Sequence, residues 1–398
     1  MKKSVTVAAV VVGMLLLVTG LTGPVAAGTL NYDVEIFGEY ELDYVYEDKD
    51  FVDNDDDESS YLEHELDLGF SISVLDNVSI VGEMEYADNT LGEGDHAIGQ
   101  DNNIDVEAAY VEMAFEPVTI TGGKFSFSFP HAFDDSPLLD DEITGVALDF
   151  DMVSVGWLRA DDFSEMTEDK RDIFYVKGDM EAGGARIRPY LAYENQGENA
   201  AGVGSGIDAA FTTYWLGVAL EMEAGALGLG ADFIYGDRSF SDDTFGIDQS
   251  GMMVDFIAEL DTGSITPSVF AVYSTGEDDD FAESEWMPII SSDLEPFNII
   301  EDELWEGIIL FGGGISDITT LPKLEHELLA FYAEGTNDAG LGLFSDEDNV
   351  CEIDFNSSYE LLENCELYSE LGYAVADIDG LDNEEDAISV EIGMEIEF

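Results

Sequence analysis

The feature that most constrains this chain is a long alternation, with a period of two residues, between apolar and acidic side chains. In the closing stretch AISVEIGMEIEF, Ile388 and Ile396 share one parity, whereas Glu391 and Glu395 share the other. Consecutive side chains of a strand point to opposite faces, so this period predicts extended strands with one oily face and one acidic face. The pattern recurs near the other end of the chain, in YDVEIFGEYELDYVY and YLEHELDLGFSISV.

The first residues predict export. Lys2 and Lys3 precede an apolar run at 5–18, and Val25-Ala26-Ala27 supplies the small residues that a signal peptidase requires. We therefore expect a signal peptide at 1–27 and a single domain at 28–398. No later segment approaches the roughly 20 consecutive apolar residues of a membrane helix.

The charge balance excludes several classes of partner. The chain has 90 Asp and Glu residues, 12 Lys and Arg residues and a net charge of -78. Disorder is disfavoured, because 45% of the residues are hydrophobic and 11% are aromatic. A folded polyanion repels nucleic acid and attracts cations. We expect no nucleic-acid partner.

The links between strands alternate between short and long, which is the layout of an antiparallel meander with one tight rim. That layout is typical of an outer-membrane β-barrel with short periplasmic turns and long extracellular loops. We predict about 18 strands, or 16 if the glycine-rich segment 305–316 is a loop. The apolar face then meets lipid, since only a closed barrel satisfies every backbone group there, and the acids face a wet lumen. A soluble sandwich would bury a similar stripe, but the length and number of the strands and only nine prolines disfavour it. The short links are at 76–77, 116–117, 151–152, 181–184, 223–226, 262–263, 319–323 and 363–364; the acid-rich long links are at 48–59, 89–103, 130–141, 161–172, 196–209, 239–250, 276–302, 335–350 and 377–386.

Several blocks of the chain resemble a known family. In order, they cover almost all of the mature chain: residues 108–148, 188–197, 214–221, 231–240, 268–290, 324–338 and 354–377. Together they look like the outer-membrane homotrimeric porins of sulfate-reducing bacteria, and more weakly like siderophore-type porins. The resemblance implies a trimer of barrels in the outer membrane of a Gram-negative-type bacterium, through which small hydrophilic solutes diffuse. This chain is more acidic than we expect of that family, so the family's selectivity is not carried over.

Because basic residues are few, their positions are informative. By parity, we expect a basic ladder that faces the lumen, and we expect Phe125, Phe127 and Phe129 to face lipid. Arg159 shares the lipid parity of Trp157. The expected ladder consists of Lys124, Lys177, Arg186, Arg188 and Arg238.

The third long loop, Phe129–Glu142, is predicted to fold into the pore opposite this ladder. Its Phe133, Leu138 and Leu139 would pack on the wall. An acidic lobe that faces a basic ladder would make a constriction with a transverse field. The alternative is that the cations only neutralise nearby lumen carboxylates. The acids expected to face the water are Asp134, Asp135, Asp140 and Asp141.

These observations favour a passive, cation-selective diffusion channel; the alternative is a substrate-specific channel of the siderophore or anion type. An enzyme is disfavoured, because no histidine lies near a convincing nucleophile. We expect no resident cofactor, although acidic segments at 50–59 and 276–285 offer oxygens for Ca²⁺ or Mg²⁺ without the spacing of a calcium loop. The four histidines show no zinc spacing. Cys351 and Cys365 are predicted to be free thiols, because they fall at opposite ends of adjacent strands.

Overall fold

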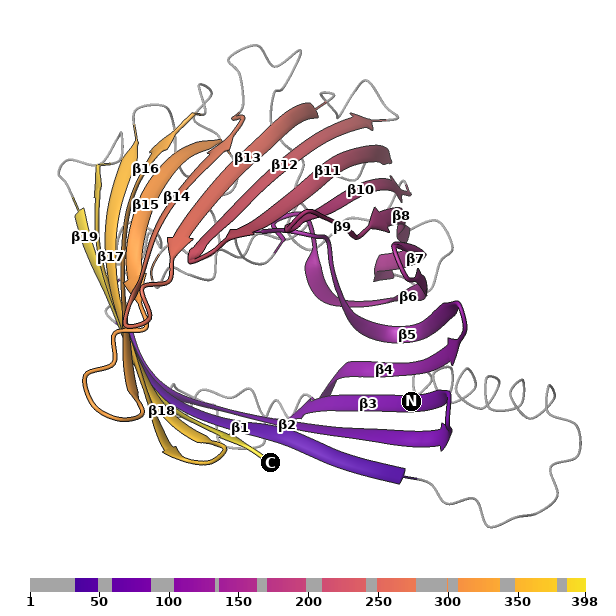
Figure 1. Ribbon diagram of the computed structural model, residues 1–398, viewed down its shortest axis with the longest axis horizontal. Helices are drawn as coiled ribbons and strands as arrows, with labels where there is room; N and C mark the ends of the chain where they lie inside the picture. The colour runs from indigo at the N-terminus through magenta and orange to yellow at the C-terminus, as the bar shows by residue number, and fades with distance from the viewer. Residues whose placement is uncertain are drawn as a thin grey trace, which may run out of the picture.

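The computed structural model describes residues 33–48, 59–86, 104–132, 136–162, 170–197, 210–240, 249–276, 299, 307–336, 348–377 and 385–398, and shows one closed sheet (Figure 1). Every strand pair in it is antiparallel, and, with one exception, strands that follow each other along the chain are paired. Within these ranges, no helix has the length and apolar character needed to cross a membrane. The strands are β1 Asp33–Asp48, β2 Ser59–Leu75, β3 Val78–Tyr86, β4 Ile104–Phe115, β5 Val118–Ser128, β6 Asp140–Phe150, β7 Val153–Asp162, β8 Lys170–Gly178, β9 Met180–Ala182, β10 Ala185–Gln196, β11 Phe211–Ala224, β12 Leu227–Phe240, β13 Gln249–Leu260, β14 Thr266–Ser274, β15 Ile308–Ser316, β16 Leu324–Gly335, β17 Asn349–Leu362, β18 Cys365–Asp377 and β19 Glu385–Glu397.

The first and last strands close the barrel. β1 pairs with both β2 and β19, so that Tyr44 lies opposite Leu62 on one side and Ile392 on the other. β8 and β9 are separated only by Asp179 and both pair with β10, so they form one strand of the wall. The wall therefore has the predicted 18 strands. The glycine-rich segment that made 16 an alternative forms β15.

The two rims differ as the pattern of links predicts. The short links form tight turns, several of which need a left-handed backbone. Asn364 between β17 and β18 has a φ of 66°, and Gly225 between β11 and β12 has a φ of 73°. Asparagine and glycine tolerate these angles at low steric cost, which explains their presence in such turns. Apart from the link at 130–141, of which only 133–135 are left out, most of each long link lies outside the described residues.

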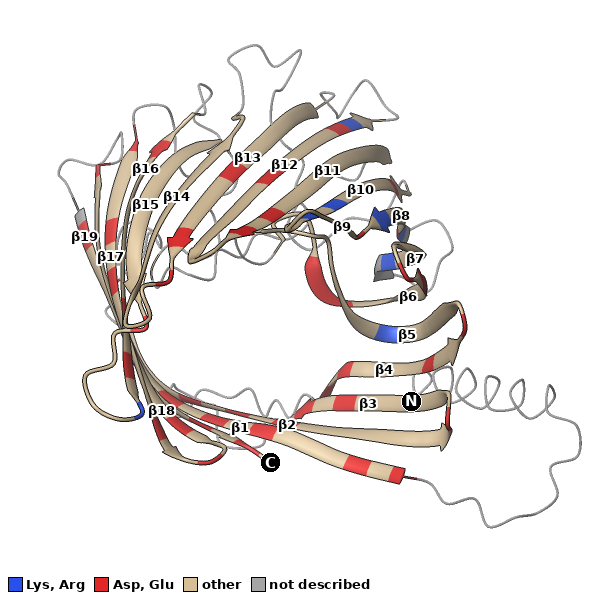
Figure 2. Ribbon diagram, in the orientation of Figure 1, with Lys and Arg blue, Asp and Glu red and all other residues tan. Residues whose placement is uncertain are grey.

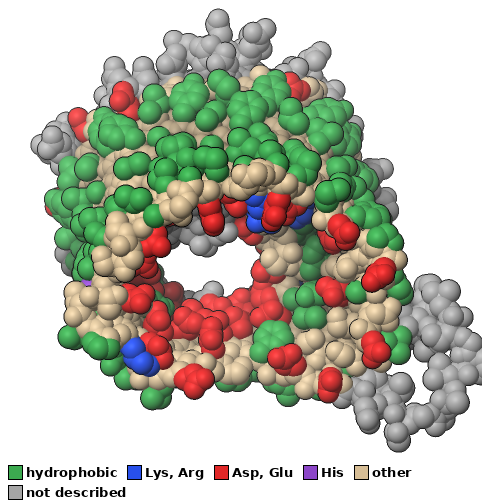
Figure 3. Space-filling view, in the orientation of Figure 1, with side chains coloured by type: hydrophobic (Ala, Val, Ile, Leu, Met, Phe, Trp, Pro, Cys, Tyr) green, Lys and Arg blue, Asp and Glu red, His purple; other side chains and the backbone are tan. Residues whose placement is uncertain are grey.

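The two faces of the wall separate by chemistry. Leu191, Tyr214 and Leu216 point outward and are each more than half exposed, whereas Trp215, between two of them, points inward and is fully buried. The outside of the barrel carries a broad apolar surface (Figure 3). An apolar exterior of this kind is stable against hydrocarbon, and closure through β1 and β19 pairs the two strands that would otherwise be the edges of the sheet.

The outer half of the β5–β6 hairpin leaves the wall. Pairing between β4 and β5 ends at Lys124, and pairing between β6 and β7 ends at Thr144. Beyond these points, 125–128 and 140–143 pair only with each other. We call residues 125–143 the inner hairpin; its residues 133–135 are not described. The ribbon shows it curving from the wall toward the middle of the barrel (Figure 1).

This bend corrects one prediction. Phe125, Phe127 and Phe129 do not face lipid; they are 6%, 4% and 1% exposed. The ring of Phe127 lies 4.7 Å from that of Tyr175, on the inner side of β8. The predicted alternation of apolar and polar residues is present in β5. The end of β5 turns into the barrel, however, so its apolar face packs on the inside of the wall.

Candidate pore constriction

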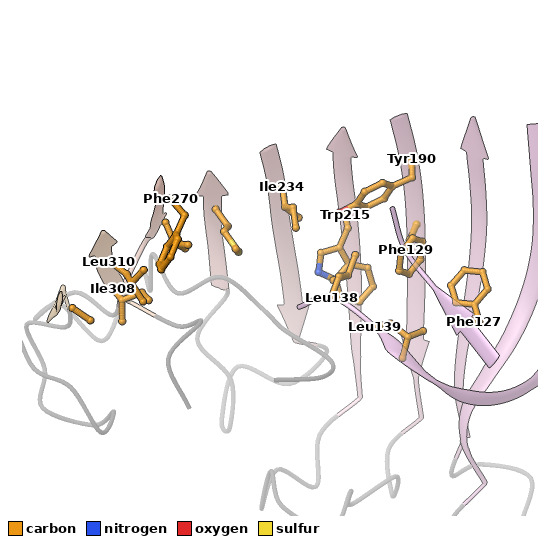
Figure 4. Packing of buried hydrophobic residues seen from close by; sticks show 14 of the residues in the cluster. Phe127, Phe129, Leu138, Leu139, Tyr190, Trp215, Ile234, Phe270, Ile308 and Leu310 are labelled. Atoms are coloured by element: carbon orange, nitrogen blue, oxygen red, sulfur yellow. The ribbon is translucent and has the colours of Figure 1, made fainter. Parts of the chain in front are cut away.

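Apolar side chains dock the inner hairpin onto the wall. Phe129 lies 5.0 Å from the ring of Tyr190 on β10. Leu138 and Leu139 are almost fully buried, in the same cluster as Trp215 of β11 (Figure 4). The predicted packing of these leucines on the wall is what the structure shows; Phe133 lies outside the described residues.

Glycine makes room for this docking on the wall itself. A Cβ built on Gly217 of β11 would lie 2.1 Å from the Tyr190 ring, which in turn supports Phe129. We expect Gly217→Ala to lower the free energy of unfolding by about 1–3 kcal/mol, since the ring must shift in a packed site. Urea unfolding of the barrel in detergent measures this change.

The matched control is Gly122→Ala on β5. A Cβ there would meet only Val146, at 4.0 Å. It should leave the unfolding midpoint close to that of the parent. Equal midpoints for Gly217→Ala and Gly122→Ala would contradict the close packing of Tyr190.

Polar contacts add to the docking. Arg188 Nη2 donates to the His131 carbonyl at 2.7 Å, and Lys177 Nζ donates to the Ser128 carbonyl at 3.2 Å. The Ala132 amide donates to Asp232 Oδ2 at 2.7 Å. Two members of the expected basic ladder thus hold the backbone of the inner hairpin.

The ladder is neutralised locally by carboxylates. Arg186 donates from Nη2 to Asp179 Oδ2 at 2.5 Å, and Arg188 is ion-paired with Glu221 of β11. Arg238 Nη2 lies 3.9 Å from Glu194 Oε2. The alternative reading of the cations, as partners of lumen acids, therefore has direct structural support.

Arg171 was missed by the reading of the sequence. It pairs with Glu194, the fully buried carboxylate that also faces Arg238. Arg171 shares the parity of Lys177 on β8, so extending the alternation along that strand would have found it. The described ladder runs over β8, β10 and β12 (Figure 2).

The remaining predicted residues lie on the inner hairpin or directly before it. Lys124 lies on the face opposite to Phe125, with Nζ 3.8 Å from Glu107 Oε2 of β4. Asp140 lines a cavity of about 500 Å³ that it shares with Lys177, Arg186 and Arg188. Asp141 is exposed at the start of β6. Asp134 and Asp135 lie outside the described residues.

The opposite side of the lumen is an acidic wall without basic residues. Lys and Arg occur on β5, β7, β8, β10 and β12, and on no other described strand. Figure 3 shows acidic side chains lining one side of the opening, and basic side chains with acids beside them on the other. Part of this wall encloses a recess of about 470 Å³. We define the acidic wall as Glu39, Glu41, Asp43, Glu65, Asp67, Glu83, Glu327, Glu370, Glu391 and Glu395.

A second inward contact was also missed. Ile299 belongs to the long link between β14 and β15, where residues 277–298 and 300–306 are not described. It is 2% exposed, and its amide donates to Glu352 Oε1 of β17 at 2.9 Å. The only signal in the sequence was the apolar pair Ile299-Ile300 in an acidic loop.

Two minor predictions have clear outcomes. Cys351 and Cys365 are free thiols, as predicted. Cys351 lies opposite Val375, whereas Cys365 lies opposite Leu362 beside the turn, so the two fall at different ends of the β17–β18 pair. The acidic segments proposed for Ca²⁺ or Mg²⁺, 50–59 and 276–285, lie almost wholly outside the described residues.

A closed barrel of 18 antiparallel strands, with an apolar exterior and many acids facing its interior, has the architecture of a bacterial outer-membrane β-barrel. No family model matches the chain, and no curated protein matches it. Solved structures do match. Pseudomonas aeruginosa OpdQ is 14% identical with a TM-score of 0.63, covering 92% of this chain and 99% of that one.

Two further structures agree with this fold. Pseudomonas aeruginosa OccK11 (OpdR) is 12% identical, with a TM-score of 0.62 and coverage of 92% of this chain and 96% of that one. Acinetobacter baumannii OccAB1 is 14% identical, with a TM-score of 0.61 and coverage of 94% and 98%. At these identities the likeness is one of fold. It shows the barrel architecture and does not single out the family of sulfate-reducing bacteria.

Proposed function

We propose that this protein is an outer-membrane porin whose water-filled lumen passes small hydrophilic solutes by passive diffusion and prefers cations. The observation that carries the proposal is the unequal neutralisation of the two sides of the lumen. The ladder arginines are paired with Asp179, Glu194 and Glu221. The acidic wall has no Lys or Arg on its own strands.

This imbalance sets the sign of the potential in the pore. Field lines concentrate in a channel with low-dielectric walls, so an excess of carboxylates over Lys and Arg raises the local concentration of cations and lowers that of anions. The paired ladder contributes little net charge. A transverse component remains across the opening between the acidic wall and the ladder with the inner hairpin docked on it, where it would orient dipolar solutes.

Reversal potentials in a planar bilayer under a KCl gradient test the proposal. We expect the reversal potential to have the sign that results when K⁺ permeates faster than Cl⁻. A potential of the opposite sign would mean that the ladder dominates and would overturn cation selectivity.

A substrate-specific channel is the second candidate. One solved structure with this fold is Pseudomonas aeruginosa OpdK with vanillate, at 13% identity and a TM-score of 0.59. In this chain, the cavity between Asp140 and the ladder places Arg188, Lys177 and aromatic Phe129 around one space. Those groups suit a small aromatic carboxylate. Liposome swelling separates the candidates: a cutoff by size alone supports the general porin, and saturation by vanillate supports the specific channel.

We also propose a homotrimer, as the resemblance to the porins of sulfate-reducing bacteria implies. Native mass spectrometry of the detergent-extracted protein tests this. A mass of three chains is the expected result, and a monomer at all protein concentrations would contradict it.

A further inference from the structure

A buried cluster of one histidine and two carboxylates fastens the inner hairpin to the wall. His131 of the hairpin meets Asp232 of β12 and Asp255 of β13. Its Nε2 atom lies 2.8 Å from Asp255 Oδ2 and 3.8 Å from Asp232 Oδ2. The three side chains are 1%, 1% and 0% exposed. Their ligand atoms all lie within 4.8 Å of one another.

Hydrogen bonding leaves part of this cluster unsatisfied. Oδ2 of Asp232 accepts from the Ala132 amide, and Oδ2 of Asp255 pairs with His131. The other oxygen of each carboxylate, Oδ1, is buried and has no hydrogen-bond donor among the described residues. A buried carboxylate oxygen without a donor carries a desolvation cost that native structures rarely leave uncompensated.

The charges point to what would offset that cost. Two buried carboxylates exceed the charge that a single imidazole supplies, even when the imidazole is protonated. Arg188, the arginine that contacts the His131 backbone, donates to the His131 carbonyl and is paired with Glu221. A divalent cation supplies the missing positive charge and gives the free oxygens a partner.

The donor set also fits such an ion. One imidazole nitrogen with carboxylate oxygens is a ligand set of Zn²⁺ and of similar divalent transition metals. Zn–N and Zn–O bonds of roughly 2.0–2.2 Å place tetrahedral donor atoms about 3.3 Å apart. The observed separations of 2.8 and 3.8 Å bracket that value, so shifts of a few tenths of an ångström suffice.

We propose that His131, Asp232 and Asp255 form a binding site for one divalent transition-metal cation, which fastens the inner hairpin to the barrel wall. One ligand comes from the inner hairpin and two come from wall strands, so the ion would link the hairpin to the sheet. The ion would fix the width of the narrow region without lying in the path of the solute. This role is independent of which solute passes.

The test uses the mature barrel in detergent, washed with chelator and then titrated with Zn²⁺. We expect one Zn²⁺ per chain by elemental analysis after gel filtration, and a higher temperature for the loss of folded gel mobility when Zn²⁺ is present. With Co²⁺ as the probe, visible absorption bands typical of tetrahedral coordination should appear. His131→Ala and Asp255→Asn should each weaken binding at least tenfold.

His326→Ala is the matched control. The His326 imidazole contacts Thr320 and Ser357 at the short-turn rim, away from the cluster. The His326→Ala variant should bind Zn²⁺ as tightly as the parent. This result would distinguish binding at the cluster from general binding of Zn²⁺ by surface acids. If His131→Ala does not fold, the test rests on Asp255→Asn, because this change keeps nearly the same side-chain volume. Equal Zn²⁺ binding by the parent and by the folded cluster variants, or no Zn²⁺ binding by the parent, would overturn the site.

Discussion

Replacing Glu39, Glu41 and Glu395 together by Gln should weaken cation selectivity more than any other change of three residues. The carboxylate oxygens of these residues lie within 4.8 Å of one another on β1 and β19. Charges this close act on a passing ion as one site, because their spacing is below the Debye length of ~8 Å at physiological salt. The reversal potential in a KCl gradient should fall by roughly half or more.

A triple variant at the turns provides the matched control. Glu116→Gln, Glu223→Gln and Glu363→Gln together remove the same number of carboxyl groups, but from the short-turn rim. Screening by salt should make their effect on the reversal potential small. Equal shifts for the two triple variants would show that selectivity follows the overall charge and not the acidic wall.

Replacing Leu138 and Leu139 together by Ala should release the inner hairpin and raise the single-channel conductance. Both leucines are almost fully buried against the wall. Each Leu→Ala change in a packed site costs about 2–5 kcal/mol, and a loss of roughly 3 kcal/mol moves a docking equilibrium by a factor of about 100. Single-channel recordings should show larger and noisier open currents, while the barrel itself still folds.

The control is the same chemical change on the outer face. Leu191→Ala with Leu216→Ala alters two lipid-facing side chains that are 52% and 55% exposed. This variant should keep the conductance of the parent. An unchanged conductance for Leu138→Ala with Leu139→Ala would mean that the inner hairpin does not narrow the pore.

The sequence predicted most of the fold because the barrel repeats one local rule. Parity alone separates Leu191 and Tyr193 from Arg188 and Tyr190, and short turns with Gly or Asn mark one rim. Such signals arise from neighbouring residues and need no knowledge of distant contacts. The predicted number of strands was uncertain only at β15, because its three consecutive glycines have no side chains to show the alternation.

The site was harder to predict, because it depends on where a strand leaves the wall. Phe125 and Phe127 have the alternation of lipid-facing residues. Nothing local to them shows that β4 and β7 stop pairing with this hairpin. The partners of the cations, such as Glu194 and Glu221, and the meeting of His131 with Asp255, join residues far apart in the chain. Only the register of the closed sheet brings them together.

The most direct test of a wet lumen with fixed negative charge is single-channel conductance measured over a series of KCl concentrations. Carboxylates along the pore hold a layer of counterions that persists when the bulk salt is diluted. We expect the conductance to fall less steeply than the salt concentration and to level off at low salt. Conductance strictly proportional to salt, or no conductance by the folded protein, would contradict it.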